Sequence, residues 1–244
     1  QAFGPQEITE PRLARFCQFV KEACQTHTGI NPSNRPTDKP GEMRDRRGDN
    51  TYNSVFGNPF IDGVFVPNGK TEQQVTSAGH IFEECPLTSG YFFADILNTP
   101  ASIMGPTDTS PFSLVLDGVD YGSEDRLCLC LHANSGITFD LNAFRVRFAG
   151  SRIVRFSAVV GIVDCAPKES IESAAAFWVL ADGQVRYSNT LRRGAAEPVE
   201  IDLAETDRFL TLVITDGGSL DITLDRNAIG YDWGLFAEPK LILE

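Results

Sequence analysis

Apolar and polar residues alternate with a period of two over most of the chain from residue 56 onward. Ile137, Phe139 and Leu141, for example, alternate with Thr138 and Asp140. The same alternation recurs over residues 112–117, 127–132, 154–160, 177–181, 184–187, 199–203, 210–214 and 241–243. Because side chains of a β-strand point to alternate faces, this pattern predicts many short strands with one face in a core. No long helical pattern interrupts them, so the chain is predicted to be mainly β, an antiparallel β-sandwich or barrel.

One turn and one aromatic side chain sharpen this prediction. Asp182-Gly183 separates two strand-like runs, and this dipeptide favours a two-residue β-hairpin. Trp178 lies between Phe177 and Val179, which are predicted to face the core, so Trp178 is predicted to face the other side. There it is either exposed to a ligand or a neighbouring domain, or it is buried under the preceding part of the chain.

The first 55 residues have a different pattern. Thr9 is a candidate N-cap, and apolar residues at three- and four-residue spacing predict an amphipathic helix from Pro11 to Gln25. Scattered Pro and Gly among charged residues then predict a polar linker. The expected organisation is an N-terminal helical segment over 1–30, a linker over 31–55 and a β-sandwich module over 56–244.

Composition and charge limit the classes of partner. The chain has 244 residues, 42% of them hydrophobic, and a formal net charge of -12. An acidic chain repels phosphate backbones, so no nucleic-acid partner is expected, and no stretch is long and apolar enough to predict a membrane span. The chain begins with Gln1 and shows no signal-peptide pattern, which predicts a processed chain or a piece of a larger protein.

Motifs of the common enzyme classes are absent. The sequence has no Gly-x-Ser-x-Gly elbow, no His-Glu-x-x-His and no phosphate-binding glycine loop, and it contains only 3 His. Cys128, Cys130 and His132 would share one face of a strand. Either they bind a soft metal ion, or two small apolar thiols face a second layer; the absence of the usual zinc spacings favours the thiols.

Five blocks of the second half carry a resemblance to a known family. They are Leu131-His132-Ala133-Asn134-Ser135-Gly136-Ile137-Thr138-Phe139-Asp140-Leu141, Phe156-Ser157-Ala158-Val159-Val160-Gly161-Ile162-Val163-Asp164, Phe177-Trp178-Val179-Leu180-Ala181-Asp182-Gly183, Leu210 to Gly217, and Asp232-Trp233-Gly234-Leu235-Phe236-Ala237-Glu238-Pro239-Lys240-Leu241. In this order, over about residues 112–244, they resemble the NPCBM family of carbohydrate-binding modules. The resemblance implies a galactose-binding-like sandwich of jelly-roll type, carried by larger secreted or cell-surface bacterial proteins. The expected location is therefore extracellular, periplasmic or at the bacterial cell surface.

The resemblance also implies where a ligand would bind. Sugar modules of this kind bind at loops on one end of the sandwich, and five residues are predicted to lie at strand ends there: His132, Asn134, Asp164, Asp232 and Trp233. Such modules often hold a structural calcium ion near the chain ends. Glu238, at a family Asp position in the last strand, is the predicted ligand of that ion.

The leading hypothesis is a non-catalytic carbohydrate-binding module of a larger secreted or cell-surface bacterial protein, with a galactose-like glycan as partner. The family strand that residues 156–164 resemble ends in Gly-Val-Asp-Asp, and its second Asp is Cys165 here. In the final block, the family's His, second Asp and Trp are Trp233, Leu235 and Phe236 here. These replacements motivate an alternative, a structural docking domain that contacts other domains of its parent protein without binding sugar. A glycosidase is a third hypothesis, because acidic residues are abundant, but their separation cannot be read from the sequence.

Overall fold

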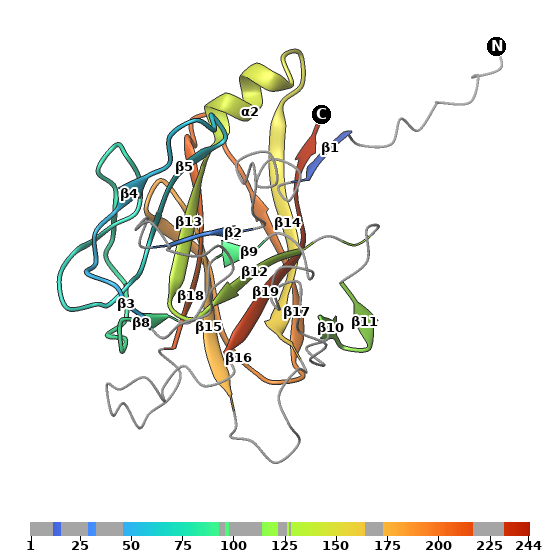
Figure 1. Ribbon diagram of the computed structural model, residues 1–244. Coiled ribbons are helices and arrows are strands. Elements are labelled where there is room, and N and C mark those ends of the chain that lie inside the picture. The colour runs from blue at the N-terminus through green and yellow to red at the C-terminus, as the bar shows by residue number, and fades with distance from the viewer. Residues whose placement is uncertain are drawn as a thin grey trace, which may run out of the picture.

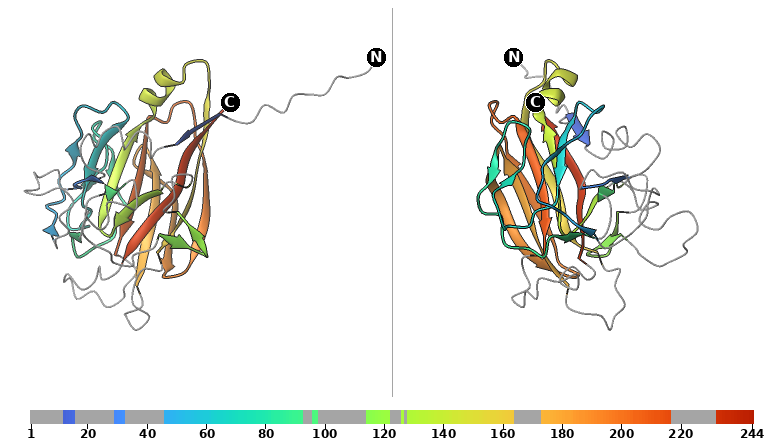
Figure 2. Two further views of the ribbon diagram at one scale, coloured as in Figure 1. Left: turned by 45° about the vertical axis from the view of Figure 1, so that its right-hand side comes forward. Right: turned by 60° about the vertical axis from the view of Figure 1, so that its left-hand side comes forward.

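Two antiparallel β-sheets packed face to face form the body of the protein (Figures 1 and 2). The structure is a computed structural model that describes residues 12–15, 29–32, 46–92, 96–97, 114–121, 126, 128–163, 173–216 and 232–244. The prediction of a mainly β, antiparallel sandwich is confirmed. None of the helices in these residues is long and apolar enough to span a membrane.

The first sheet has the strand order β17-β14-β19-β12-β9-β2, and β1 also pairs with β19. Its strands are β17 (Ala196–Asp202), β14 (Ile153–Ile162), β19 (Trp233–Leu243), β12 (Cys128–His132), β9 (Ile96–Leu97), β2 (Gly29–Ile30) and β1 (Arg12–Arg15). The second sheet has the order β16-β15-β18-β13-β5-β4. Its strands are β16 (Gln184–Arg192), β15 (Ala174–Ala181), β18 (Phe209–Thr215), β13 (Ser135–Asp140), β5 (Ile61–Phe65) and β4 (Asn53–Ser54).

Three two-stranded ladders and one helix complete the described elements. The ladders pair β3 (Arg46–Arg47) with β8 (Tyr91–Phe92), β6 (Gln73–Gln74) with β7 (Ile81–Phe82), and β10 (Val115–Leu116) with β11 (Val119–Asp120). The helix is α2 (Leu141–Arg147), at the end of the sandwich where β13 finishes (Figure 1).

The main core lies between the two sheets and follows the predicted alternation. Leu129 and Leu131 of β12 are buried in it, whereas Cys128 and Cys130 belong to a second apolar cluster. That second cluster also contains Leu114, Leu116 and Tyr121 from the β10–β11 hairpin region, so this segment covers the outer face of the first sheet. The thiols therefore face a second layer, as the favoured interpretation of the sequence had it.

A third cluster covers the outer face of the second sheet. Phe177 and Val179 lie in the main core, and Leu180 lies in this third cluster with Trp178 packed against it. The indole ring of Trp178 meets the Phe82 ring edge to face, with 5.1 Å between ring centroids. Trp178 thus faces away from the main core, as predicted, and it is partly buried beside Phe82 of β7, which precedes β15 in sequence.

The predicted hairpin is present. Ala181 and Gln184 are register partners, and Asp182 and Gly183 between them both have positive φ, 49° and 81°. Positive φ at both central positions is the requirement of a type I′ turn, which matches the right-handed twist of the two strands.

Three sequence expectations need correction. The helix predicted from Pro11 to Gln25 is wrong over Arg12–Arg15, which form β1, and the rest of that prediction lies outside the described residues. Arg12–Arg15 form a strand because they pair with β19. Strand β12 pairs only with Trp233–Ala237 of β19, and β1 pairs with Lys240–Leu243 on the same edge.

The period-two pattern over residues 137–141 predicts a strand up to Leu141, but helix α2 begins at that residue. The Asp140 side chain accepts a hydrogen bond from the Asn142 backbone N–H and caps α2, while Leu141 and Phe144 bury its inner face. The alternation over residues 154–160 predicts that Val154 faces the core, but a bulge between Ile153 and Arg155 puts Ile153 there instead.

Candidate functional site

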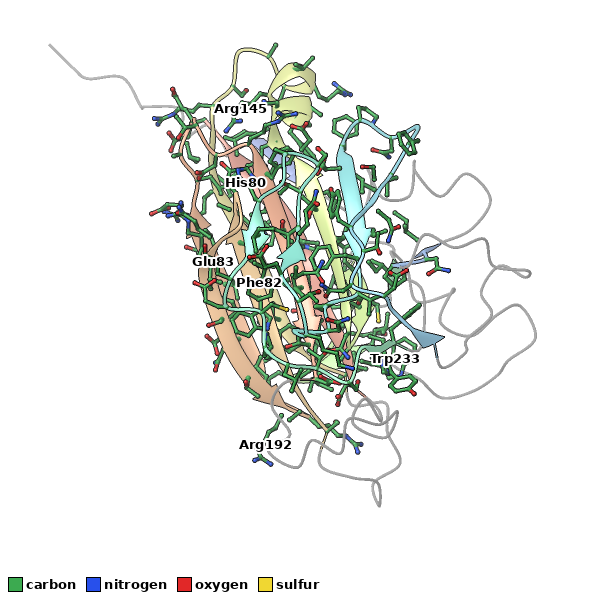
Figure 3. The ribbon with its side chains drawn as sticks, turned by 90° about the vertical axis from the view of Figure 1, so that its left-hand side faces the viewer. His80, Phe82, Glu83, Arg145, Arg192 and Trp233 are labelled. Carbon is green, nitrogen blue, oxygen red and sulfur yellow. The ribbon has the colours of Figure 1, made fainter. Side chains whose placement is uncertain are left out.

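Strand ends from both sheets meet at one end of the sandwich. β12 ends at His132 in the first sheet, Ala133–Asn134 cross over, and β13 begins at Ser135 in the second sheet. The first residue of β19, Trp233, pairs with His132, so β19 begins at this end. Ile214 near the end of β18 pairs with Ser135, so β18 finishes at this end. Trp233 marks this end in Figure 3, and α2 lies at the opposite end (Figure 1).

The rings of His132 and Trp233 contact each other edge to face. Their centroids are 4.7 Å apart with an interplanar angle of 87°, and each residue is only 3% exposed. His132 Nδ1 donates a hydrogen bond to the carbonyl oxygen of Ala133 at 2.6 Å. Burial lowers the pKa of His132 to about 4, so the imidazole is neutral at neutral pH.

Asn134 ties three segments of the chain together. Its Nδ2 donates to the Tyr91 carbonyl oxygen and to Asp216 Oδ2, both at 2.9 Å, and its Oδ1 accepts from the Asp216 backbone N–H at 2.8 Å. Nδ2 also lies 3.2 Å from the Ser89 hydroxyl. The residue is fully buried, so these bonds satisfy a side chain that would otherwise be costly to bury.

Asp216 is the acceptor at the centre of this network. Its carboxylate accepts from the backbone N–H of Ser89 at 3.1 Å, from the Ser89 hydroxyl and from Asn134 Nδ2. Burial raises the pKa of Asp216, and the hydrogen bonds from Ser89 and Asn134 oppose that rise. The carboxyl group is therefore buried away from water, and hydrogen bonds from three donors offset the cost of desolvating its charge.

Asp232 is less well satisfied. Its backbone carbonyl accepts from the Ala133 N–H at 3.2 Å, and the Ala174 backbone N–H donates to its carboxyl group. Oδ2 is buried and has no hydrogen-bond partner among the described residues, and the same holds for the Ser173 hydroxyl. Burial, and then the charge of Asp216, raises the pKa of Asp232 to about 8, so this carboxyl group is mostly protonated at neutral pH.

The structure brings four of the five predicted binding residues to this end, in two adjacent groups. His132 and Trp233 belong to the outer face of the first sheet, and Asn134 and Asp232 join the polar network with Asp216. Asp164 lies outside the described residues. The four residues are 0–3% exposed, so they underlie this end of the sandwich and do not form an open rim.

Glu238 lies in β19 with a positive φ of 47° and is partly exposed. Its charge contributes to the raised pKa of Tyr121, after desolvation, whereas Arg126 acts in the opposite direction. Calcium takes six to eight oxygen ligands in proteins. In the part of the chain that the structure describes, no three His, Cys, Asp or Glu side chains converge, so Glu238 lacks the partners of an assembled calcium site there.

Cys128, Cys130 and His132 likewise form no three-ligand cluster that could hold a metal ion among the described residues. Burial, and then the charge of Asp120, raises the pKa of Cys128 to about 12, so its sulfur is a protonated thiol at neutral pH. Both sulfurs pack in the apolar cluster under the β10–β11 hairpin region, next to Trp233.

A groove of ≈ 510 Å³ lies elsewhere, between residues 69–72 and 81–85. Lys70, Glu72 and Glu83 line its exposed part, and Phe82 and Cys85 line its inner part. Figure 3 shows Phe82 and Glu83 well away from Trp233. None of the predicted binding residues lines this groove.

Sequence reasoning missed two members of the polar network, Ser89 and Asp216. Asp216 stands in a segment that resembles the family, in Thr-Asp-Gly at the end of a strand, and this signal was available. Ser89 is 127 residues away from Asp216 in sequence, and no local pattern marks it.

A two-sheet antiparallel sandwich with a buried polar cluster at one end defines the class of protein as a β-sandwich module. The sequence model of the NPCBM/NEW2 domain family matches residues 113–242. The match covers more than half of the chain, and the protein belongs to this family of carbohydrate-binding domains. No curated protein sequence matches the chain.

Several solved structures are similar in fold. CBM51 from Clostridium perfringens GH95, in complex with methyl-galactose, is 16% identical, with 88% of this chain and 99% of that chain covered and a TM-score of 0.38. The tandem CBM51 modules of the family 98 glycoside hydrolase from Streptococcus pneumoniae SP3-BS71 are 15% identical, with 99% and 52% covered and a TM-score of 0.42. CBM51-2 in complex with GlcNAc, with the INT domains of Clostridium perfringens ZmpB, is 13% identical, with 82% and 40% covered and a TM-score of 0.39.

Proposed function

We propose that this protein is a non-catalytic carbohydrate-binding module that binds glycan at the end of the sandwich where β12 ends and β19 begins. The observation that carries the proposal is the convergence of His132, Asn134, Asp232 and Trp233 on that one end, in a member of a carbohydrate-binding family. Loops at the end of a rigid sandwich are where such scaffolds place binding residues.

The buried residues have a supporting role in this proposal. The Asn134–Asp216 network fixes the end of β18 against the crossing from β12 to β13. Asp232 brings a buried carboxyl oxygen without a hydrogen-bond partner among the described residues, and Trp233, the next residue in sequence, brings an aromatic ring. A sugar needs both kinds of group, polar partners for its hydroxyls and an apolar surface for its C–H face.

The finer parts of the proposal concern ligand and setting. The proposed ligand is a galactose-type glycan, and the proposed setting is a larger secreted or cell-surface bacterial protein, outside the cytoplasm. The galactose-binding-like jelly-roll class and a structural calcium ion at Glu238 belong to the same proposal. Thermal unfolding with and without EDTA tests the calcium: a fall in Tm on chelation, reversed by added Ca²⁺, is expected if the ion is present.

Calorimetric titration with a panel of glycans tests the binding. The panel includes methyl-galactose and GlcNAc, the sugars bound in two of the structures named above. We expect saturable binding of at least one glycan by the wild-type chain, and a loss of about tenfold or more in affinity in Trp233→Phe, since aromatic anchors of a site commonly carry this much.

Trp178→Phe is the matched control, because Trp178 is the other tryptophan and lies on the outer face of the second sheet. It should bind with wild-type affinity. A folded wild-type protein that binds no glycan of the panel contradicts the proposed function. Equal losses in the two variants contradict the proposed location of the site.

One observation favours a second candidate, a docking domain that binds no sugar. The four convergent residues are 0–3% exposed, as expected for residues that only hold a fold together. This candidate predicts a folded protein that fails the whole glycan panel and binds instead to a neighbouring domain of its parent protein.

A further inference from the structure

Two buried carboxyl groups anchor the chain on either side of residues 217–231. The chain leaves the second sheet at Asp216, just after β18, and enters the first sheet at Asp232, just before β19. Asp216 is 4% exposed and Asp232 is 2% exposed, and the charge of Asp216 acts on Asp232. Both groups therefore lie in the same dry region, at the end of the sandwich that Trp233 marks in Figure 3.

The described neighbours supply hydrogen bonds to this pair but no ion pair. Asp216 has three donors, from Ser89 and Asn134, whereas the Asp232 carboxyl group has the Ala174 N–H alone and an Oδ2 without a partner. No Lys or Arg forms a salt bridge with either carboxylate in the described part of the chain.

The titratable and charged groups around the pair are few in the described elements. β12 brings neutral His132, and the 88–91 segment brings only Tyr91. β15 begins beside Asp232 with uncharged Ala174, and Ser173 before it is also uncharged. β16 and the turn after it bring Arg192, which is exposed opposite Ala174, and Arg193, whose backbone N–H donates to the Ser173 carbonyl.

Two carboxylates that share a buried site without a cation do not ionise together at low cost. Asp216 is the member with enough donors to carry the charge, so Asp232 is the member that keeps its proton. Ionisation of Asp232 would put a second, poorly hydrogen-bonded charge between the ends of β18 and β19. Repulsion and the demand for water would then push these strand ends apart.

We propose that the Asp216–Asp232 pair makes glycan binding at this end of the sandwich pH-dependent: the pair binds one proton in the binding-competent form, and losing that proton in mildly alkaline solution weakens binding. This inference rests on the proposed function, since it concerns regulation of the same site. Burial and the neighbouring Asp216 raise the pKa of Asp232 to about 8, which puts the loss between neutral and mildly alkaline pH.

The test compares three proteins across pH by calorimetric titration with the glycan that binds best at pH 7. They are the wild type, Asp232→Asn, which mimics the protonated acid, and Asp202→Asn, an exposed Asp on β17 that serves as the control. If only the protonated form binds, wild-type affinity falls by about tenfold between pH 7 and pH 9. Asp202→Asn should show the same fall, whereas Asp232→Asn should keep its pH 7 affinity at pH 9.

The outcomes separate the two proposals. A wild-type affinity that is constant from pH 7 to pH 9, or an equal fall in Asp232→Asn, overturns the role of the pair and leaves the proposed function standing. If no glycan binds at any pH, the proposed function fails, and with it the regulation of binding. Urea unfolding of the same proteins then still decides whether the pair holds its proton: Asp232→Asn must lose the decline in stability that the wild type shows from pH 6.5 to pH 8.

Discussion

Asn134 and Asp216 hold each other by a reciprocal pair of hydrogen bonds. Asn134 Nδ2 donates to Asp216 Oδ2 at 2.9 Å, and the Asp216 backbone N–H donates to Asn134 Oδ1 at 2.8 Å. Asn134 stands where the chain crosses from the first sheet to the second, and Asp216 stands where β18 ends. The pair therefore closes one end of the sandwich across both sheets.

Replacing Asn134 with Ala should lower the free energy of unfolding by about 3 kcal/mol, because it leaves a buried carboxylate and a buried backbone N–H without this partner. Urea unfolding monitored by tryptophan fluorescence measures the change. Asn189→Ala is the control: Asn189 is exposed, and its replacement should cost less than about 0.5 kcal/mol. Equal, small costs in both variants would show that the reciprocal pair does not stabilise the fold.

The pH dependence of stability should reveal two opposed contributions. The pKa of His132 is lowered to about 4 from 6.5, so its contribution is present above pH 6.5 and is lost as the pH falls towards 4. The pKa of Asp232 is raised to about 8 from 3.8, so its contribution is present below pH 3.8 and is lost as the pH rises towards 8. Between about pH 4 and 6.5 the two slopes cancel in the wild type.

Single variants should separate these slopes. In His132→Gln, stability should fall with rising pH from about 4 to 8, by up to about 1.4 kcal/mol per pH unit. In Asp232→Asn, stability should instead rise with pH from about 4 to 6.5. Unfolding free energies measured at half-unit pH intervals check both signs. Parallel curves for the two variants would contradict the assignment of these slopes to His132 and Asp232.

Phe82 tests whether residues before the family match belong to the folded unit. It lies outside residues 113–242, is 1% exposed, and packs against the Trp178 ring on the second sheet. Phe82→Ala should cost about 3–5 kcal/mol, as expected for a buried aromatic ring. Phe56→Ala is the matched control, since Phe56 is 91% exposed and its loss should be nearly neutral. A neutral Phe82→Ala would mean that this segment does not pack on the sandwich.

Gly183 and Gly194 both have positive φ, but only Gly183 has close neighbours where a Cβ would lie. Their Ala variants therefore separate the cost of backbone strain from the cost of steric crowding. A Cβ at Gly194 meets nothing within 4 Å, so Gly194→Ala should cost only the backbone term, about 1 kcal/mol. A Cβ at Gly183 would lie 2.8 Å from the Ile81 carbonyl oxygen, so Gly183→Ala should cost clearly more. Thermal unfolding ranks the two variants. The reverse order would contradict the packing of the Asp182-Gly183 turn against β7.

Local chemistry explains which parts of the fold could be predicted. The alternation of Leu129 and Leu131 with two thiols, and the turn at Asp182-Gly183, each depend on neighbouring residues only, and both are confirmed. The helix over residues 11–25 was predicted from an equally regular local pattern. It fails over Arg12–Arg15 because the open edge of β19 offers backbone pairing that no local pattern reports.

The candidate site was predictable only in part for the same reason. Strand-end positions pointed to His132, Asn134, Asp232 and Trp233, and the structure brings these four to one end. Their burial was not predictable, since it depends on distant segments such as the β10–β11 hairpin region that covers the cluster containing Trp233. The contact of Ser89 with Asp216 joins residues 127 positions apart, and only tertiary structure reveals it.

The central claim is that glycan binds at the end of the sandwich beside Trp233. A fluorescence titration of Trp178→Phe tests it most directly, because the protein contains two tryptophans and Trp233 is then the sole emitter. The account predicts a saturable change in Trp233 emission with the same midpoint as calorimetric binding of the wild-type chain. Calorimetric binding with unchanged Trp233 emission, or emission that changes only for Trp178 in Trp233→Phe, would put the glycan elsewhere and contradict it.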